Sequence, residues 1–544
     1  MPQQSHSVSE EEPLLSRRQN LPQNEDDTTS RSPNAPEEPP KKPSKWPTFT
    51  TIHPRYRFIP FLGCLIILIN ESEYFIKQVA TMRAIEAMYC YEHYLALGSP
   101  LADLGKRIPE RLCKSESIQK QLAGTAGGIM FVRMLSAIVG AVPLGWLADR
   151  WGRKVVLVLH KVNVTITCTA WLVLYLGFPK VPIWTLYLSG IPGLIGGNYD
   201  VGLAMLFAAY TDVMPSATER ASLFFLTTSM QYLAQTFCPT IGAFLMNLDG
   251  HGGTPQVNLA VSLSLTVITV LVTAFLFPET LHESKKASKL PTDPENSRRP
   301  SGTEPSPPPS KKPSLLTSVT EAVSNLGLLN LFLLSLSILL SASGIKSIDW
   351  FALIQYPVIK LSWSFPLASS IVSLSGILML LHFSLFLPFL NRLAARRLGS
   401  AGKGHFAIMM GSATFLSVGA TLIGFSGSSA AFVGAVVVYL FGEGLPTATQ
   451  AYIVSLIEKD KVARVMTTLS ITSIGGKLVA SVLFPKVLAL GLDSGVPVLV
   501  GLPLFVSAGM FVVSAVCVSV VGVRMGLAGR EKVDEGEGDG GSAS

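Results

Sequence analysis

Long apolar segments, each long enough to cross a membrane, dominate this sequence. A membrane-spanning helix needs about 20 apolar residues. Twelve segments meet this requirement, over residues 58–78, 122–146, 155–177, 183–210, 222–247, 257–278, 325–352, 367–390, 406–425, 429–455, 465–489 and 496–523. Only 15% of the residues are charged and 48% are hydrophobic, whereas a soluble globular chain carries about 25% charged residues. The sequence therefore predicts an all-α polytopic membrane protein with twelve transmembrane helices.

Basic residues lie in alternate loops between these segments, which is the pattern of cytoplasmic loops in membrane proteins. They include Arg150, Arg153, Lys154 and Lys161 around the second and third spans, and Arg392, Arg396, Arg397 and Lys403 between the eighth and ninth. The short loops on the other face carry few basic residues. We therefore expect both termini in the cytoplasm, and we interpret the net charge of +7 as a sign of membrane orientation and not of a nucleic-acid partner.

Two polar stretches divide the chain into halves. Residues 1–57 form a polar N-terminal tail that we expect to be disordered, and residues 279–324 form a cytoplasmic linker rich in Pro, Ser and charge. Six spans (58–278) precede the linker and six (325–523) follow it, and a short cytoplasmic tail (524–544) ends the chain. This division predicts two pseudo-symmetric six-helix bundles.

Few charged or strongly polar side chains fall inside the predicted spans. Placing a charge there costs about 2.5 kcal/mol or more, so such groups usually face a cavity and serve function. The predicted members of a substrate and proton-coupling cavity are Glu71, Arg133, Asn198, Asp200, Lys346, Asp349, Glu443 and Lys477.

Two pairs are candidates for proton coupling, because a carboxyl group that alternately meets water and a cation binds and releases a proton. The first is Glu71 with Arg133, which lies twelve residues before Gly145 and so roughly 18 Å deeper along its helix. The second is Glu443 with Lys477. The alternative is that these are static ion pairs, or that Glu71 and Glu73 lie at the external water interface, which is the position we favour for Glu73.

The short turn between the second and third spans reads Gly145-Trp-Leu-Ala-Asp-Arg-Trp-Gly-Arg-Lys154. It resembles the loop signature of the major facilitator superfamily, Gly-x-x-x-Asp-Arg-x-Gly-Arg-Lys. The resemblance implies a central cavity and alternating access. It assigns roles to six residues: Asp149 in locking the halves at the cytoplasmic side, Gly145 and Gly152 in the tight turn, and Arg150, Arg153 and Lys154 on the inner surface. The fourth span lacks the family's Arg, and the fifth-span motif at Cys238–Ala243 is partial, which weakens the case for drug–proton antiport.

The segment Ile108–Ala123 resembles fungal members related to the proton-coupled folate transporter group, and that resemblance implies export of small metabolites. Cys90 and Cys113 both fall in the predicted first external loop. In an oxidising compartment they would either form a disulfide or remain free thiols.

The leading function is therefore proton-coupled export of a metabolite or toxic compound. The alternative is proton-coupled import of an organic anion, since several cavity cations could neutralise it. We expect no enzyme activity, because neither a His-Glu-x-x-His pair nor a phosphate-binding Gly-x-x-x-x-Gly-Lys-Ser/Thr loop occurs in the sequence.

The expected partners are a small-molecule substrate, protons and the lipid bilayer, with no cofactor, metal or nucleic acid, and the expected state is a monomer. The cell membrane is the favoured location. The acidic dileucine pattern at Glu10–Leu15 keeps a vacuolar or endosomal membrane as an alternative.

Overall fold

The computed structural model describes residues 56–214, 217–248, 254–281, 327–398, 401–456 and 462–538. Regular structure in these ranges is entirely helical. Most of the predicted N-terminal tail and linker, with the dileucine pattern, lies outside the described residues, as do residues 539–544.

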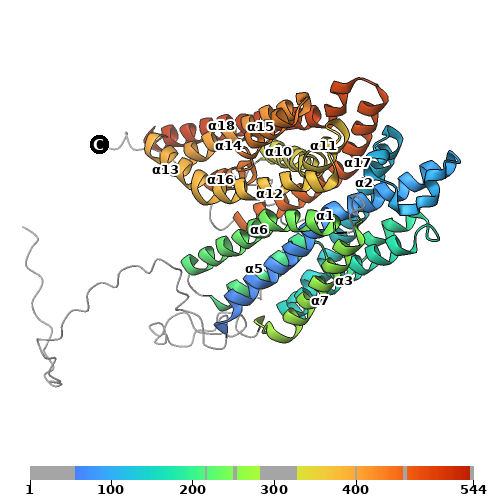
Figure 1. The fold of residues 1–544 in the computed structure, drawn as a ribbon. Helices are drawn as coiled ribbons and strands as arrows, with labels where there is room; N and C mark the ends of the chain where they lie inside the picture. Colours follow the sequence, from blue (N-terminus) through green and yellow to red (C-terminus); the bar gives the residue numbers. More distant parts are fainter. Residues whose placement is uncertain are drawn as a thin grey trace, which may run out of the picture. The chain divides into compact units, whose positions relative to one another are not determined.

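Residues 56–281 form the N-terminal half (blue to green in Figure 1) and residues 327–538 the C-terminal half (yellow to red). The helices of the N-terminal half are α1 (Ile59–Ala96), η2 (Pro100–Arg107), η3 (Glu110–Cys113), α2 (Glu116–Trp151), α3 (Arg153–Gly177), η4 (Ile183–Gly190), α4 (Gly193–Gly196), α5 (Tyr199–Val213), α6 (Ala217–Met246), α7 (Gln256–Leu271) and η5 (Val272–Leu276). Those of the C-terminal half are α10 (Leu328–Ser347), η7 (Ile348–Gln355), α11 (Tyr356–Lys360), α12 (Phe365–Leu381), η8 (His382–Phe386), α13 (Leu387–Leu398), α14 (Ala401–Phe425), α15 (Ser429–Leu440), α16 (Leu445–Leu456), α17 (Val462–Asp493), η9 (Pro497–Gly501) and α18 (Leu502–Gly538).

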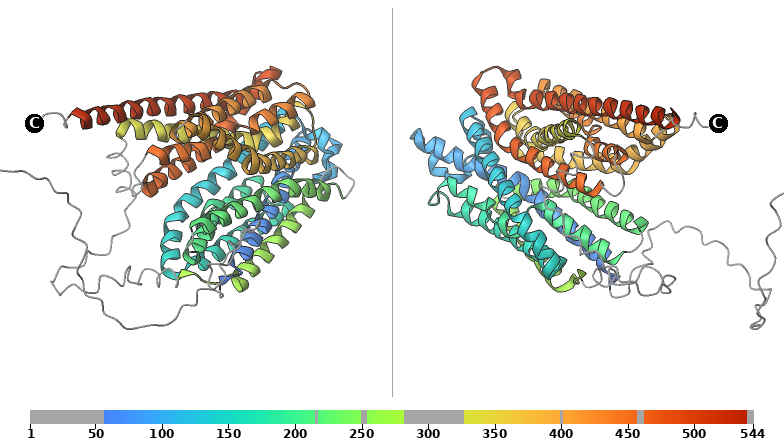
Figure 2. Two further views of the ribbon diagram at one scale, coloured as in Figure 1. Left: turned by 90° about the vertical axis from the view of Figure 1, so that its left-hand side faces the viewer. Right: turned by 180° about the vertical axis from the view of Figure 1, so that it is seen from behind.

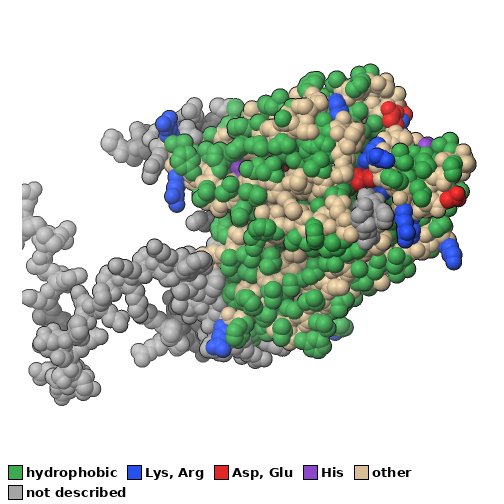
Figure 3. All heavy atoms as spheres, in the orientation of Figure 1, with side chains coloured by type: hydrophobic (Ala, Val, Ile, Leu, Met, Phe, Trp, Pro, Cys, Tyr) green, Lys and Arg blue, Asp and Glu red, His purple; other side chains and the backbone are tan. Residues whose placement is uncertain are grey.

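Ten helices in the described ranges are long and apolar enough to cross a membrane. Two predicted spans are not among them. The span predicted at 183–210 is broken into η4, α4 and α5, of which the longest has 15 residues. The span predicted at 222–247 forms the continuous 30-residue helix α6. Apolar side chains cover the flank of the helices, and charged ones gather toward the two ends (Figure 3).

The first span is longer than its predicted range of 58–78, because α1 continues to Ala96. Charged side chains neutralise one another on this helix: Glu73 pairs with Lys77 inside the predicted range, and Arg83 pairs with Glu86 beyond it. Residues three or four apart lie on one helix face, so such pairs can be buried together. At the other end of the chain, α18 runs past the predicted boundary of residue 523.

Most helix packing stays within a half. In the N-terminal half, α1 packs on α6 and α7, and α3 packs on α7; in the C-terminal half, α10 packs on α17 and α18, and α14 packs on α15 and α18. Two extensive contacts join the halves, α6 with α12 and α2 with α17 (Figure 2). The central space between the halves is therefore bordered by these four helices.

A disulfide between Cys90 and Cys113 ties η3 to α1. We call this end of the molecule, with η2 and η3, the disulfide end. Cys90 lies inside α1 and not in the predicted external loop, because the helix is longer than predicted. Nearby, the completely buried carboxylate of Glu86 accepts hydrogen bonds from Arg83 Nη1 at 2.9 Å, Lys114 Nζ at 2.9 Å and Gln119 Nε2 at 2.7 Å.

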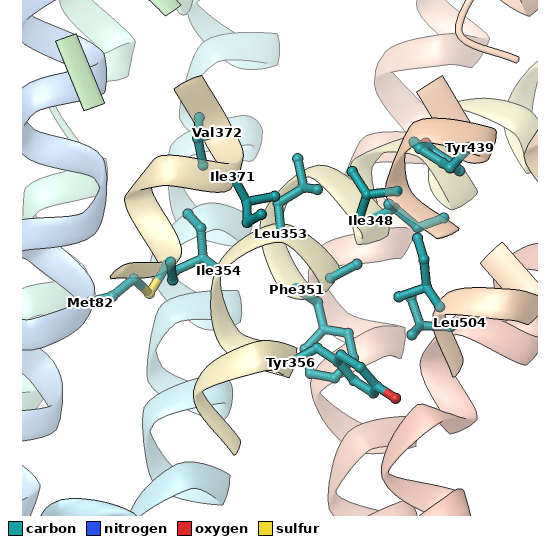
Figure 4. Close-up of a cluster of buried hydrophobic side chains, with 14 of the residues drawn as sticks. Met82, Ile348, Phe351, Leu353, Ile354, Tyr356, Ile371, Val372, Tyr439 and Leu504 are labelled. Atoms are coloured by element: carbon teal, nitrogen blue, oxygen red, sulfur yellow. The ribbon is translucent and has the colours of Figure 1, made fainter. Parts of the chain in front are cut away.

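The two halves touch at the disulfide end. Glu110 Oε1 accepts a hydrogen bond from the backbone N–H of Phe365, the first residue of α12, at 2.7 Å. Lys120 forms an ion pair with Asp493 of α17. An apolar cluster lies alongside, in which Met82 of α1 is drawn close to Ile354 of η7 (Figure 4). These contacts close the space between the halves at this end.

Candidate functional site

A cavity of about 350 Å³ lies between the two halves. Its lining includes every residue predicted for the substrate and proton-coupling cavity: Glu71, Arg133, Asn198 and Asp200 from the N-terminal half, and Lys346, Asp349, Glu443 and Lys477 from the C-terminal half. These side chains come from α1, α2, α5, α10, η7, α17 and the turn between α15 and α16.

The break in the fourth predicted span creates one polar wall of this cavity. Gly197 adopts a φ of 69°, which favours glycine, and Asn198 caps α5 by accepting a hydrogen bond from the backbone N–H of Val201 at 3.2 Å. Inside a membrane, the carbonyl groups freed by such a break need donors. Asn163 Nδ2 donates to the Gly197 carbonyl at 2.8 Å, and the His160 ring contacts the Gly196 carbonyl at 3.1 Å.

The C-terminal half supplies two further irregularities. Helix α15 ends at Leu440 and α16 begins at Leu445, and Glu443 lies in the glycine-flanked turn between them. Asp349 lies in η7, a π-helical stretch continuous with α10. Such π-helical turns concentrate at functional sites. Acidic groups therefore enter the cavity where regular helix is interrupted.

The ion pair that crosses the cavity differs from the two predicted pairs. Lys477 Nζ lies 3.4 Å from Asp200 Oδ2, and Asn198 Nδ2 donates to the same carboxylate at 2.9 Å. In the described ranges, Glu71 is not within ion-pair distance of Arg133, and Glu443 is not within ion-pair distance of Lys477. The structure thus joins the fourth and eleventh predicted spans directly.

The burial of two charged groups was not predicted from the sequence: Lys161 lies beside the cavity, and Glu73 lines it. Lys161, predicted beside a cytoplasmic loop, is buried in α3, where its Nζ donates to Asn70 Oδ1 at 2.6 Å. Its position eight residues into α3, about 12 Å along the axis, was the available signal. Glu73, for which we favoured the external water interface, is buried; it pairs with Lys77 and accepts a hydrogen bond from Cys168 Sγ at 2.9 Å.

The turn with the loop signature joins α2 to α3 at the opposite end, which we call the motif end. Gly152 has a φ of 116° there. The carboxylate of Glu279, which follows η5, accepts hydrogen bonds from the backbone N–H groups of Arg153 at 3.0 Å and Lys154 at 3.2 Å. An acidic group at a helix N-terminus also meets the positive end of the helix dipole. Glu279 is therefore the carboxylate that caps this helix.

Asp149 and Asp212 share one guanidinium. Arg153 Nη1 donates to Asp149 Oδ1 at 2.9 Å, and Arg153 Nε lies 3.4 Å from Asp212 Oδ2 in α5. Thr280 Oγ1 also donates to Asp212 at 3.1 Å. These bonds hold the ends of three N-terminal helices together; the expected role of Asp149 in locking the two halves remains a prediction.

Most of the membrane-spanning region matches a known protein family. Residues 115–480 match the family model of the Major Facilitator Superfamily. The chain belongs to this superfamily. It is accordingly a multi-pass membrane transporter and not an enzyme.

Two curated relatives of this transporter are named as efflux pumps. The MFS efflux pump atnC of Emericella nidulans is 25% identical over 454 residues, covering 82% of this chain and 83% of the relative. The efflux pump ustT of Aspergillus flavus is 23% identical over 459 residues, covering 80% of this chain and 83% of the relative.

Solved structures of the superfamily share the fold at low identity. The nucleoside transporter NupG superposes with a TM-score of 0.56 at 12% identity, covering 85% of this chain and 98% of NupG. The human organic anion transporter MFSD10 superposes with a TM-score of 0.52 at 16% identity, covering 86% of this chain and 99% of MFSD10.

Proposed function

We propose that this protein exports a small organic molecule by alternating access, driven by protons that move in the opposite direction. In this proposal, residues 58–278 and 325–523 form two pseudo-symmetric bundles of six spans. Residues 279–324 link them in the cytoplasm. The motif end faces the cytoplasm, the protein acts as a monomer, and the cell membrane is its location.

One observation carries the proposal: charged and polar groups from both halves converge on a single cavity of about 350 Å³. Groups that are costly to bury in a membrane are retained when they bind a substrate or an ion. Because the contacts at the disulfide end close the cavity there, we assign the structure to the inward-facing part of the cycle. The names of the fungal relatives support export as the direction.

Proton coupling is assigned to the cavity carboxylates. Glu443 is the first candidate, since it lies in the break of a span and its Oε1 is buried without a hydrogen-bond partner among the described residues. Asp200 is bound to Lys477 across the two halves, so parting of the halves would free this carboxylate for a proton. Glu71, Arg133 and Asp349 complete the set of charged groups that the cycle would use.

The direction of transport is tested by comparing metabolites in cells and medium of the source organism with and without the gene. Retention of a compound inside deletion cells supports export. Loss of uptake of an external compound would instead establish import.

Coupling is then tested with that compound in proteoliposomes. Flux that stops when a protonophore collapses the pH gradient supports proton coupling, whereas unchanged flux refutes it. Glu443→Gln should abolish the gradient dependence while leaving exchange of the compound across the membrane at zero gradient. Glu116→Gln, which neutralises an exposed carboxylate at the disulfide end outside the cavity, is the matched control.

A further inference from the structure

The central cavity has a smaller recess of about 130 Å³, which is lined by the N-terminal half and by Lys346 of α10. Several residues line both spaces, Arg133 and Lys346 among them. The recess continues along α1 beyond the cavity, past Thr81 to Ile85, and so extends toward the disulfide end, where the halves are in contact. It is therefore the blind end of the cavity.

The two spaces differ in the carboxylates of their lining. The main cavity is lined by five carboxylates, from Glu71, Glu73, Asp200, Asp349 and Glu443, and by four cationic side chains, from Lys77, Arg133, Lys346 and Lys477. The recess shares the first three of these cations but has no carboxylate in its lining. An anion in the recess would thus meet positive groups without a carboxylate in the wall.

Two of these cations are available to a ligand. Lys77 is neutralised by its ion pair with Glu73. Arg133 and Lys346, by contrast, have no hydrogen bond and no carboxylate within ion-pair distance among the described residues. The nearest acidic residue along the chain to Lys346 is Asp349, one helical turn away, and it lines the main cavity but not the recess.

The remaining wall of the recess is largely apolar. Its apolar part includes Met82, Ile85, Ile129, Met130, Met134 and Trp171, and its polar part comes from Tyr74, Gln78, Thr81, Thr167 and Ser189. Methionine side chains adapt to irregular ligands, and the indole ring offers a large flat surface. A guanidinium binds a carboxylate through two parallel hydrogen bonds. The recess therefore combines a cationic rim with an adaptable, ring-binding wall.

We infer that the transported molecule is an amphipathic organic anion, whose carboxylate binds Arg133 and Lys346 while its apolar or aromatic part enters the recess. This inference rests on the proposed function and names the substrate class of that site. An organic cation is disfavoured because it would lie against Arg133. A neutral molecule would leave Arg133 in the membrane without an ion-pair partner.

The test uses three probes of one shape: 2-naphthoate, 2-naphthamide and 2-naphthylmethylammonium. Equilibrium binding of each to the full-length protein in lipid nanodiscs is measured at pH 7. We expect the carboxylate to bind about tenfold or more tightly than the amide, as one charge-assisted hydrogen bond provides, and the ammonium to bind most weakly. A carboxylate that binds no more tightly than the amide overturns the inference.

Variants locate the site. Arg133→Gln should reduce the carboxylate-to-amide ratio to about one, and Arg133→Lys should restore part of it; Lys346→Gln should lower it. Lys180→Gln removes an exposed cation outside the recess and should leave the ratio unchanged. A ratio unaffected by both Arg133→Gln and Lys346→Gln would overturn the assignment.

The binding experiment and the coupling experiment can fail independently of each other. If the amide and carboxylate bind equally but a metabolite is still exported in a gradient-dependent manner, the anion inference is wrong and the proposed function stands. If the carboxylate binds selectively at Arg133 but flux ignores the pH gradient, the proton-driven mechanism is wrong and the substrate class stands.

Discussion

Replacing Glu110 with alanine should shift the protein away from the state that is closed at the disulfide end. The Glu110 carboxylate joins the halves by accepting the 2.7 Å hydrogen bond from the backbone N–H of Phe365. It also accepts a hydrogen bond from Lys114 at 2.8 Å, but that contact lies within the N-terminal half and can persist when the halves part.

The size of the shift follows from the bond that crosses the halves. A hydrogen bond to a charged group contributes about 1.5–3 kcal/mol when its loss leaves a buried partner unsatisfied. Phe365 is completely buried, so its N–H would lack an acceptor in the closed state but could be hydrated in the open one. The ratio of open to closed molecules should therefore rise about 10- to 150-fold. Glu110→Gln keeps an uncharged acceptor and should give a smaller change.

The assay is a distance measurement by electron spin resonance in nanodiscs. Labels at Leu104 and Val496, which are exposed at the disulfide end of the two halves, report the separation of the halves directly. Glu110→Ala should transfer population to a longer distance. Glu116→Ala, which removes an exposed carboxylate at the same end, is the control. A distance distribution in Glu110→Ala that matches both wild type and this control would refute the reasoning.

Three further changes have expected outcomes. Gly127→Val should also lengthen that label distance, because its Cβ would lie 2.5 Å from a backbone carbonyl of α17, whereas Gly124→Val has no atom within 4 Å to meet and should change nothing; equal effects would contradict this. Gly152→Ala should lower the unfolding temperature, as a non-glycine residue at a φ of 116° costs about 1–3 kcal/mol and the new methyl group would overlap Glu279; an unchanged temperature in detergent would contradict it. Cys113→Ser should remove roughly 3 kcal/mol of stabilisation by the disulfide. A reductant should then lower the unfolding temperature of the wild-type protein but not that of the variant. An equal response of both proteins to the reductant would contradict this prediction.

Every polar side chain that the sequence predicted for the cavity lines it. The sequence did not predict which of these side chains form ion pairs with one another. Charged groups within apolar spans are stable only where they face a polar cavity, so both Asp200 and Lys477 could be assigned to the cavity. Their pairing depends on the break before α5, which rotates Asp200 toward the other half, and no spacing rule gives that rotation. Lys161 was missed for a different reason. A lysine close to a basic loop is indistinguishable from a loop residue until the start of its helix is known.

The cap that Glu279 places on α3 has a consequence for how the protein is made. Glu279 follows Arg153 by 126 residues, so during synthesis the N-terminus of α3 has no acceptor from this carboxylate until the last helix of the N-terminal half has emerged from the ribosome. The turn with the loop signature is then completed by a residue of its own half, before any helix of the C-terminal half exists. Synthesis of the last helix of the N-terminal half thus also supplies the residue that completes the packing of that half. The N-terminal half can therefore be fully folded in the membrane while the ribosome translates the linker.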